Sequence, residues 1–185
     1  MADYMENTNW KNNFVIKKYD KQSQNTSRIS NDISKLAGEI WREHYESITG
    51  IEQIEYMLEK YQSPQKIYED ICKNDFIYFT AEHIKDNKLI GYAACQPKND
   101  YMNLSKIYVH KDYRGNGISR GFLNEIEALC RSQHKLDKIR LTVNKYNTDS
   151  IAVYNKMGFK TVDSVKVDIG NGFYMDDYVM ELSIE

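Results

Sequence analysis

The chain has 185 residues, 41% of them apolar and 28% charged, and its 25 basic and 27 acidic side chains give a formal net charge of −2. This composition is typical of a single globular domain, and its balance of charge excludes a general electrostatic affinity for nucleic acid. The chain has no apolar run long enough for a membrane span and no basic, apolar start typical of a secretory signal, so we expect a cytoplasmic protein. Its three cysteines are widely spaced and form no C-x-x-C pair, so we expect neither a disulfide framework nor a metal site.

The N-terminal third predicts one strand and then helices. Residues 1–12 are polar and acidic and predict a flexible tail, which leaves a single domain over residues 13–185. Phe14-Val15-Ile16 is typical of a strand, and the polar stretch 20–30 predicts a loop. Apolar side chains at helical spacing then predict three successive helices, over about 31–49, 51–61 and 64–72.

Capping residues set the boundaries of these helices. Asn31 or Asp32 can cap the first helix, and Gly50 ends it. Ser63 followed by Pro64 predicts the start of the third, because proline is favoured at the first helical position.

After residue 75 the apolar pattern changes to that of a sheet. A short polar stretch, 85–88, predicts a hairpin between two strands. Strands are predicted over 76–84, 89–96, 101–109, 139–143, 159–169 and 173–184, and helices over 118–130 and 150–157. Together with the N-terminal elements, this order predicts an α/β (α+β) fold in which helices cover a mixed sheet.

The segment from Leu104 to Ser119 carries the strongest chemical signal. A strand runs into a loop with Gly115 and Gly117, and the loop opens a helix. The unpaired N–H groups and positive dipole end of a helix N-terminus bind phosphate, and Arg114 adds a permanent charge. The Walker pattern is absent, which excludes a nucleoside-triphosphatase loop. The glycine spacing and the preceding run of strands fit a Rossmann dinucleotide site badly.

Two ordered motifs resemble the GNAT superfamily of acetyl-CoA-dependent N-acetyltransferases. Arg114-x-x-Gly117-x-Ser119 resembles its motif A, [QR]-x-x-G-x-[GA], with serine at the last position. The strand Leu141–Asn144, Asn147 and the segment Ile151–Phe159 resemble its motif B. The resemblance covers about residues 76–182 and implies a mixed, mostly antiparallel sheet of about seven strands flanked by helices.

The resemblance also implies a site for acetyl-CoA, with coenzyme A as product. The strand before the loop would pair with the pantetheine arm, the N–H near Val109 would stabilise the oxyanion of the tetrahedral intermediate, and Tyr154 would protonate the departing thiolate. Asn147 would bind the pantetheine, although its residue type also suits a helix cap. The implied cofactor-binding residues are Ile107, Tyr108, Val109, Arg114, Gly115, Asn116, Gly117, Ile118, Ser119, Asn147 and Tyr154, and the implied catalytic residues are Tyr154 and Val109.

The general base has no clear signal. Many family members carry a glutamate on the strand before motif A, but residues 101–106 contain no carboxylate. His110, Glu82 and His83 are the alternatives, and a chain of water molecules is another.

The acceptor is expected to be a small-molecule primary amine, attacked directly in a ternary complex. The helical region and the last strand bring acidic and aromatic side chains suited to a cationic amine, namely Glu39, Trp41, Glu43, His44, Tyr45, Glu46, Glu52, Glu55, Tyr56, Asp176 and Asp177. Residues 56–64 loosely resemble the bacterial spermidine/spermine acetyltransferases, which makes a polyamine the leading candidate. The alternatives are a peptide N-terminus as acceptor and a non-catalytic acyl-CoA sensor. We expect a monomer or homodimer with no nucleic-acid or membrane partner.

Overall fold

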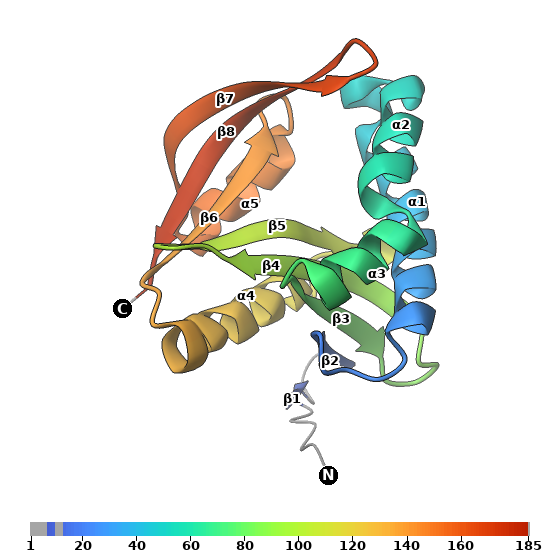
Figure 1. Ribbon diagram of the computed structural model, residues 1–185, viewed down its shortest axis with the longest axis vertical. Coiled ribbons are helices and arrows are strands. Elements are labelled where there is room, and N and C mark those ends of the chain that lie inside the picture. The colour runs from blue at the N-terminus through green and yellow to red at the C-terminus, as the bar shows by residue number, and fades with distance from the viewer. Residues whose placement is uncertain (1–6, 10–12, 185) are drawn as a thin grey trace.

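The computed structural model describes residues 7–9 and 13–184, which form one twisted sheet with helices on both of its faces (Figure 1). The helices are α1 (Thr26–Thr49), α2 (Ile51–Gln62), α3 (Pro64–Lys73), α4 (Ile118–Leu129) and α5 (Thr148–Met157), with the short turns η1 (Lys111–Tyr113) and η2 (Cys130–His134). The strands are β1 (Asn7–Asn9), β2 (Phe14–Tyr19), β3 (Ile77–His83), β4 (Leu89–Pro97), β5 (Met102–Val109), β6 (Lys138–Asn144), β7 (Lys160–Gly170) and β8 (Phe173–Ser183).

The sheet confirms the predicted fold class. Its order is β1-β2-β3-β4-β5-β6-β8-β7, and every neighbouring pair is antiparallel except β5 and β6, which run parallel. Seven of these eight strands are those expected from the sequence. The eighth, β1, falls inside the predicted tail, while residues 1–6 and 10–12 of that tail lie outside the described residues.

Each face of the sheet has its own apolar core. One core joins the sheet to α4, through side chains such as Phe79 and Phe122. The other joins it to α1, α2 and α3, through side chains such as Ile33, Ile67 and Tyr92. Because β5 contributes to both cores, it is held firmly between α4 and the N-terminal helices. The site described below is built around this strand.

The predicted start of the first helix is wrong by about five residues. Helix α1 begins at Thr26, and Asn25 precedes it with a left-handed φ of 63°. Thr26 and Ser30 are buried, and the Ser30 hydroxyl donates to the Thr26 carbonyl at 2.8 Å. The polar residues that predict a loop therefore form a helical turn, because local hydrogen bonds satisfy them. The third helix begins at Pro64 as predicted, with the Ser63 hydroxyl accepting from the Lys66 amide at 3.4 Å.

No helix among the described residues combines the length and apolar character needed to cross a membrane. Over the same residues, no group of three or more His, Cys, Asp or Glu side chains is placed to hold a metal ion.

Candidate active site

Strands β5 and β6 pair only at their first residues and then diverge. The parallel register joins Met102 to Ile139 and Asn103 to Arg140, and no pairing follows. From Leu104 to Val109, β5 therefore has one edge without a strand beside it. An unpaired strand edge offers alternating N–H and C=O groups to any extended molecule that lies along it.

The register shows which backbone groups of β5 face this open edge. On the other edge, the His110 amide donates to the Ile90 carbonyl at 2.9 Å, and the same register pairs Gly91 with Val109. Hydrogen-bonded and non-hydrogen-bonded pairs alternate along an antiparallel ladder, so the N–H groups of Val109 and Ile107 point away from β4. They are directed at the gap that separates β5 from β6.

The loop after β5 forms an anion-binding turn at the start of α4. Gly115 and Gly117 have φ values of 81° and 79°, a region that glycine enters without strain. Gly117 precedes the first turn of α4, and that turn carries no acidic residue to cancel its positive dipole end. The Arg114 guanidinium is fixed beside it, because it donates to the Val109 carbonyl at 3.1 Å and to Glu43 at 2.8 Å.

A cavity of about 410 Å³ extends from this loop along β5 to α5. Nine of the residues that the sequence assigns to the cofactor line it, namely Ile107, Tyr108, Val109, Arg114, Gly115, Gly117, Ile118, Ser119 and Tyr154. A glycine turn, an arginine, a helix N-terminus and an open strand edge thus follow one another along one cavity. This combination fits a molecule with a pyrophosphate at one end and an extended amide chain at the other.

Two of the assigned residues lie elsewhere. Asn116 is exposed, and its side chain donates to the Tyr113 carbonyl at 3.1 Å. Asn147 is 2% exposed, and its Oδ1 accepts from the Ser150 amide at 3.3 Å and lies 3.2 Å from His44 Nε2. The side chain of Asn147 therefore caps α5, which is the second of the two roles its residue type suggests.

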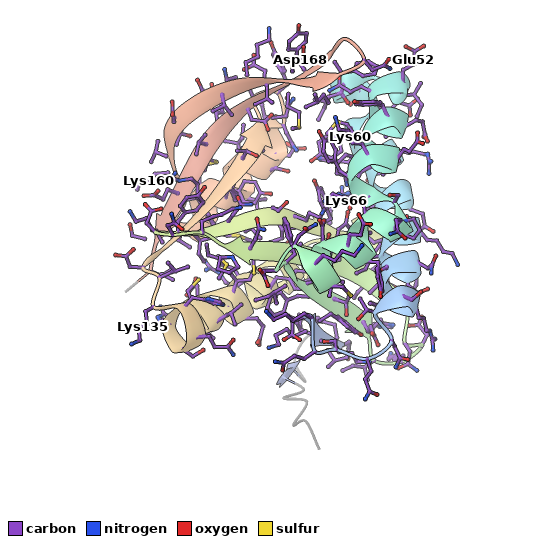
Figure 2. The ribbon with its side chains drawn as sticks, in the orientation of Figure 1. Glu52, Lys60, Lys66, Lys135, Lys160 and Asp168 are labelled. Atoms are coloured by element: carbon purple, nitrogen blue, oxygen red, sulfur yellow. The ribbon has the colours of Figure 1, made fainter. Side chains whose placement is uncertain are left out.

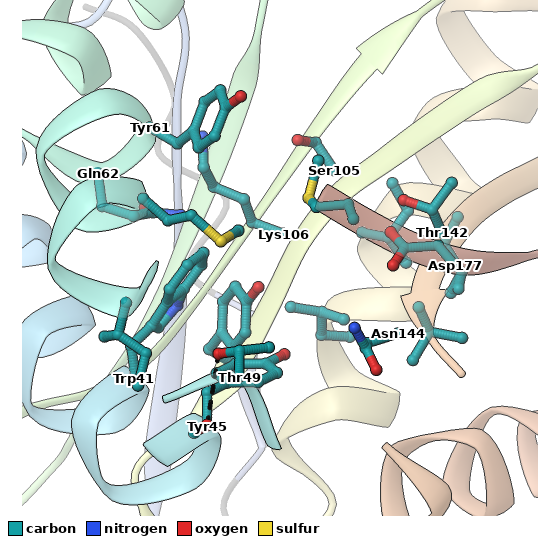
Figure 3. A pocket seen from close by; sticks show the side chains of 18 of the residues that line it. Trp41, Tyr45, Thr49, Tyr61, Gln62, Ser105, Lys106, Thr142, Asn144 and Asp177 are labelled. Atoms are coloured by element: carbon teal, nitrogen blue, oxygen red, sulfur yellow. Dashed lines mark hydrogen bonds between the residues drawn. The ribbon is translucent and has the colours of Figure 1, made fainter. Parts of the chain in front are cut away.

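A second cavity, of about 380 Å³, lies between the N-terminal helices and the β6–β8 wall. Figure 3 shows Trp41, Tyr45 and Gln62 on the helical side and Thr142, Asn144 and Asp177 on the strand side. The two cavities share four lining residues, Tyr45, Ile107, Tyr108 and Tyr154. They therefore meet at the open edge of β5, beside the phenol of Tyr154.

Aromatic side chains form the wall at this junction. The ring of Tyr108 lies 5.5 Å from that of Trp41, 5.2 Å from Tyr92 and 6.5 Å from Tyr45, measured between centroids. Burial raises the pKa of the phenols of Tyr45, Tyr108 and Tyr154 above their ordinary value of 10.0. These phenols therefore stay protonated near neutral pH and can donate hydrogen bonds or protons, but they cannot act as bases there.

Asp70 occupies the end of the second cavity nearest α3, in a cluster with two lysines. Lys66 is bonded to its Oδ1, and Lys106 lies 3.3 Å from its Oδ2. The Tyr78 hydroxyl donates to the same Oδ2 at 3.2 Å and accepts from Lys106 at 2.7 Å. One carboxylate thus faces two cations, so this end of the cavity is not acidic. The sequence had not assigned this cluster to a site, because its members come from three separate elements.

Asp177 lies on the opposite wall, on β8. The register places it across from Asn144 of β6, and its carboxylate accepts a hydrogen bond from Thr142. Burial raises its pKa to about 6, and the charge of Asp176 adds to this effect. The positive charge of Lys145 acts in the other direction and lowers the pKa of Asp177, but this ammonium is paired with Asp176 at 2.6 Å.

Most of the acidic residues expected around the acceptor lie outside this cavity. Glu43 is paired with Arg114 and Glu55 with Arg42, and Glu39 lies 3.9 Å from His110. Glu46 and Glu52 are also absent from its lining, and Figure 2 shows Glu52 at the start of α2. The prediction of an acidic pocket is therefore wrong for the helical residues. Those glutamates lie on other faces of their helices, where they pair with surface cations or meet solvent.

The predicted bases also lie outside the second cavity. Glu82 is paired with Lys17 of β2 at 2.7 Å, and His83 contacts Asp86 of its own hairpin at 2.8 Å. His110 faces Glu39 and Asp112 at the entrance to η1. None of these side chains reaches the junction where the two cavities meet.

Comparisons with known proteins agree with this geometry. The family described as "Acetyltransferase (GNAT) family" matches residues 38–159. The L-amino acid N-acetyltransferase AaaT of Escherichia coli is 29% identical over 100 residues, which cover 51% of this chain and 62% of that protein. The match thus spans less than two thirds of that relative's length.

Solved structures show the same fold. The PaiA N-acetyltransferase of Thermoplasma acidophilum, solved with coenzyme A, superposes with a TM-score of 0.74 and 23% identity, over 91% of this chain and 98% of that one. The spermidine N-acetyltransferase of Vibrio cholerae, solved with coenzyme A and spermine, gives a TM-score of 0.60 and 18% identity, over 92% of this chain and 95% of that one. At these identities the similarity shows the fold alone.

Proposed function

The chain belongs to the GNAT family of acetyltransferases, and on that premise we propose that it transfers an acetyl group from acetyl-CoA directly to the primary amine of a small molecule. The observation that carries this proposal is the junction of the two cavities at Tyr45, Ile107, Tyr108 and Tyr154. A thioester bound along β5 and an amine bound in the second cavity would meet there.

The described residues divide the cofactor's chemistry among them. Gly115, Gly117 and Arg114 would hold the pyrophosphate, and the open edge of β5 would pair with the pantetheine arm. The N–H of Val109 faces this edge and would stabilise the oxyanion, an effect worth about 3 kcal/mol per donor. Acetyl-CoA itself supplies an activated acyl group on a thiol leaving group.

Tyr154 would donate the proton that the leaving thiolate needs. Its phenol stays protonated at every relevant pH, because burial raises its pKa. The raised pKa also makes proton transfer to the thiolate less favourable than from an ordinary tyrosine, because it widens the difference from the thiol pKa of about 8.5. The proximity of donor and acceptor at the junction would have to offset this cost.

A covalent acetyl-enzyme has no support among the described residues. Cys72 is half-buried and lines neither cavity. Cys95 and Cys130 are buried, and burial raises the pKa of both thiols. Direct attack in a ternary complex is therefore the simpler route.

Hydrogen bonds between α2 and the β7–β8 hairpin favour a small acceptor over a peptide N-terminus. The hydroxyl of Tyr56 and the ammonium of Lys60 both donate to the Ile169 carbonyl, at 2.6 and 2.5 Å, and Gln53 donates to the Tyr174 carbonyl at 3.1 Å. These bonds tie α2 to the end of the β7–β8 hairpin, which reaches across to α2 in Figure 1. A peptide chain that left the cavity between α2 and this hairpin would have to break them.

The charges of the cavity favour an amine that also carries an anionic group, such as an amino acid. Its carboxylate would face Lys66 and Lys106, and its amine would face Asp177. A polyamine, the candidate that the sequence favours, would instead bring a second ammonium toward two lysines. The relative described as an L-amino acid N-acetyltransferase supports the same choice, whereas the spermidine enzyme is similar only in fold.

The test is release of free coenzyme A thiol from acetyl-CoA over a panel of amines. The panel contains amino acids, their amides, the matching decarboxylated amines, spermidine and short peptides. Turnover of an amino acid in preference to its decarboxylated amine supports the proposal and its acceptor class. Turnover of spermidine alone would indicate a polyamine as the acceptor, and turnover of peptides alone would indicate protein N-termini. Tight cofactor binding without any thiol release would support a non-catalytic sensor.

A further inference from the structure

Acetyl transfer to an amine needs a group that takes a proton from the attacking nitrogen. The sequence offered His110, Glu82 and His83 for this role, and all three lie outside the acceptor cavity. Within that cavity the described residues provide two carboxylates, Asp70 and Asp177. Their surroundings differ, and the difference identifies one of them.

The carboxylate of Asp70 is engaged by four donors from the protein. Lys66 and Lys106 hold its two oxygens, and the amide of Asn74 and the hydroxyl of Tyr78 also donate to them, at 3.3 and 3.2 Å. Its side chain is only 2% exposed. Donors from the protein therefore occupy both oxygens of Asp70, which leaves neither oxygen free for a substrate amine.

Asp177 has the opposite environment. Among the described residues no cation forms an ion pair with it, and its side-chain hydrogen bond comes from the neutral hydroxyl of Thr142. The nearby ammonium of Lys145 is engaged by Asp176 at 2.6 Å. Figure 3 shows the carboxylate of Asp177 on the strand wall, facing the space between the two walls.

Its position also brings Asp177 close to the reaction centre. Tyr45 of α1 lines both cavities, and the charge of Asp177 contributes to the raised pKa of that phenol. The other ionisable side chains around the cavity are Tyr61 on α2, Lys66 and Asp70 on α3, Lys106 and Tyr108 on β5, and Tyr154 on α5. The phenols of Tyr45, Tyr108 and Tyr154 are protonated at neutral pH. Burial lowers the pKa of Lys106, but its ammonium donates to Asp70 and Tyr78, and Lys66 is paired with Asp70. Of the two carboxylates among the described residues that line the cavity, Asp177 is thus the one that no cation pairs with.

We propose, on the basis of the acetyl transfer proposed above, that Asp177 is the general base of the reaction. The nitrogen lone pair of the neutral amine forms the C–N bond at the thioester carbon, and the carbonyl electrons move to the oxygen. The carboxylate of Asp177 takes a proton from that nitrogen as the bond forms. The oxyanion then collapses, the C–S bond breaks, and the thiolate takes a proton from Tyr154. Solvent finally removes the proton from Asp177 and restores that of Tyr154.

The acidity of Asp177 suits this role. Its pKa of about 6 keeps it ionised at neutral pH and leaves it more basic than an ordinary aspartate. General bases work best when their pKa lies near the working pH. In the wild type, kcat is expected to rise with pH through about 6, because the carboxylate must lose its own proton before it can accept another.

The test compares the wild type with Asp177→Asn, using the best acceptor of the panel. Asn keeps the size of the side chain and removes the base, so kcat should fall by about a hundredfold or more. The KM of the acceptor should rise by a much smaller factor, because its amine also loses a charged partner. The rise of kcat through pH 6 should disappear. Asp177→Glu should restore part of kcat together with that rise. Asp176→Asn is the comparison variant. It should keep kcat near neutral pH, and its rise of kcat should move to lower pH, because the charge of Asp176 raises the pKa of Asp177 and Asp176 engages Lys145.

Coenzyme A affinity, measured by calorimetry, reports folding independently, because Asp177 does not line the cofactor cavity. The assignment would be overturned by an Asp177→Asn variant that binds coenzyme A normally, keeps the kcat of the wild type and still shows the rise of kcat through pH 6. It would also be overturned by a variant that raises only the acceptor KM, since Asp177 would then bind the amine without taking its proton. A wild type that releases no thiol from any amine would overturn the proposed function, and this assignment with it.

Discussion

The cofactor half and the acceptor half of this site are built in different ways. Ten of the eighteen described residues that line the cofactor half come from one contiguous stretch, in which β5, its loop and the first turn of α4 follow one another from Ile107 to Arg120, and the others come from α1 and α5. The acceptor half takes its lining from α1, α2, α3, β5, β6, α5 and β8. Local sequence dictates the first half, whereas tertiary packing assembles the second. The first half can therefore be read from a motif, and the second only from the fold.

The two halves also differ in how they handle charge. The cofactor half presents backbone N–H groups, a helix N-terminus and Arg114, all suited to an anion. The acceptor half sets Asp177 on one wall against Lys66 and Lys106 on another. A change in the first half should therefore alter cofactor affinity, and a change in the second should alter the choice or the turnover of the amine. Three variants test this division.

The largest expected effect is on cofactor affinity, from Gly117→Asp. Its carboxylate would face the pyrophosphate, and two like charges about 4 Å apart repel by about 4 kcal/mol at an effective dielectric of 20. The affinity for coenzyme A, measured by calorimetry, should fall at least about a hundredfold, consistent with that repulsion.

Gly117→Asn is the matched control for this charge. Both side chains meet the same strain at a φ of 79°, which should cost each variant about 1 kcal/mol of stability. If the two variants bound coenzyme A equally weakly, backbone strain rather than charge would explain the loss, and the phosphate would have to be placed elsewhere.

An intermediate effect is expected at the junction, from Tyr154→Phe. The variant keeps the ring, whose centroid lies 5.9 Å from that of Phe159, and loses the proton donor. Where chemistry limits the rate, kcat should fall by about tenfold to a hundredfold. The KM for acetyl-CoA should change little, because the bond is used late in the reaction. If kcat were unchanged under those conditions, water rather than Tyr154 would supply the proton to the leaving thiolate.

The smallest effect is expected in the acceptor half, from Lys66→Gln. The Lys66 side chain is 36% exposed, and partly exposed ion pairs contribute up to about 1 kcal/mol. The KM of an amino acid should therefore rise by about threefold to fivefold, and that of its decarboxylated amine should stay constant. Lys73→Gln, on the same helix and paired with Glu69, is the control. If the KM values of both acceptors changed equally, the carboxylate of the amino acid would not bind at this end of the cavity.

The same division explains what the sequence could predict. The strand–loop–helix segment and Tyr154 were recognisable, because the phosphate turn needs glycines at fixed places beside an arginine. The divergence of β5 and β6 after Asn103 could be expected only from the family resemblance, because no local sequence pattern marks it. The cluster around Asp70 was missed because Lys106 lies 36 residues away along the chain. The glutamates of α1 and α2 led to the wrong prediction of an acidic pocket, because composition does not show which face of a helix lines a cavity.

The most direct test of the central idea, that the two halves act together on both substrates, is a grid of initial rates. Acetyl-CoA and the best acceptor are varied against each other, and protein exposed to acetyl-CoA alone is weighed by mass spectrometry. Direct transfer at the junction predicts intersecting double-reciprocal lines and a protein of unchanged mass. Parallel lines, together with protein that gains one acetyl group, would contradict the account, because the acyl group would then pass through an enzyme side chain.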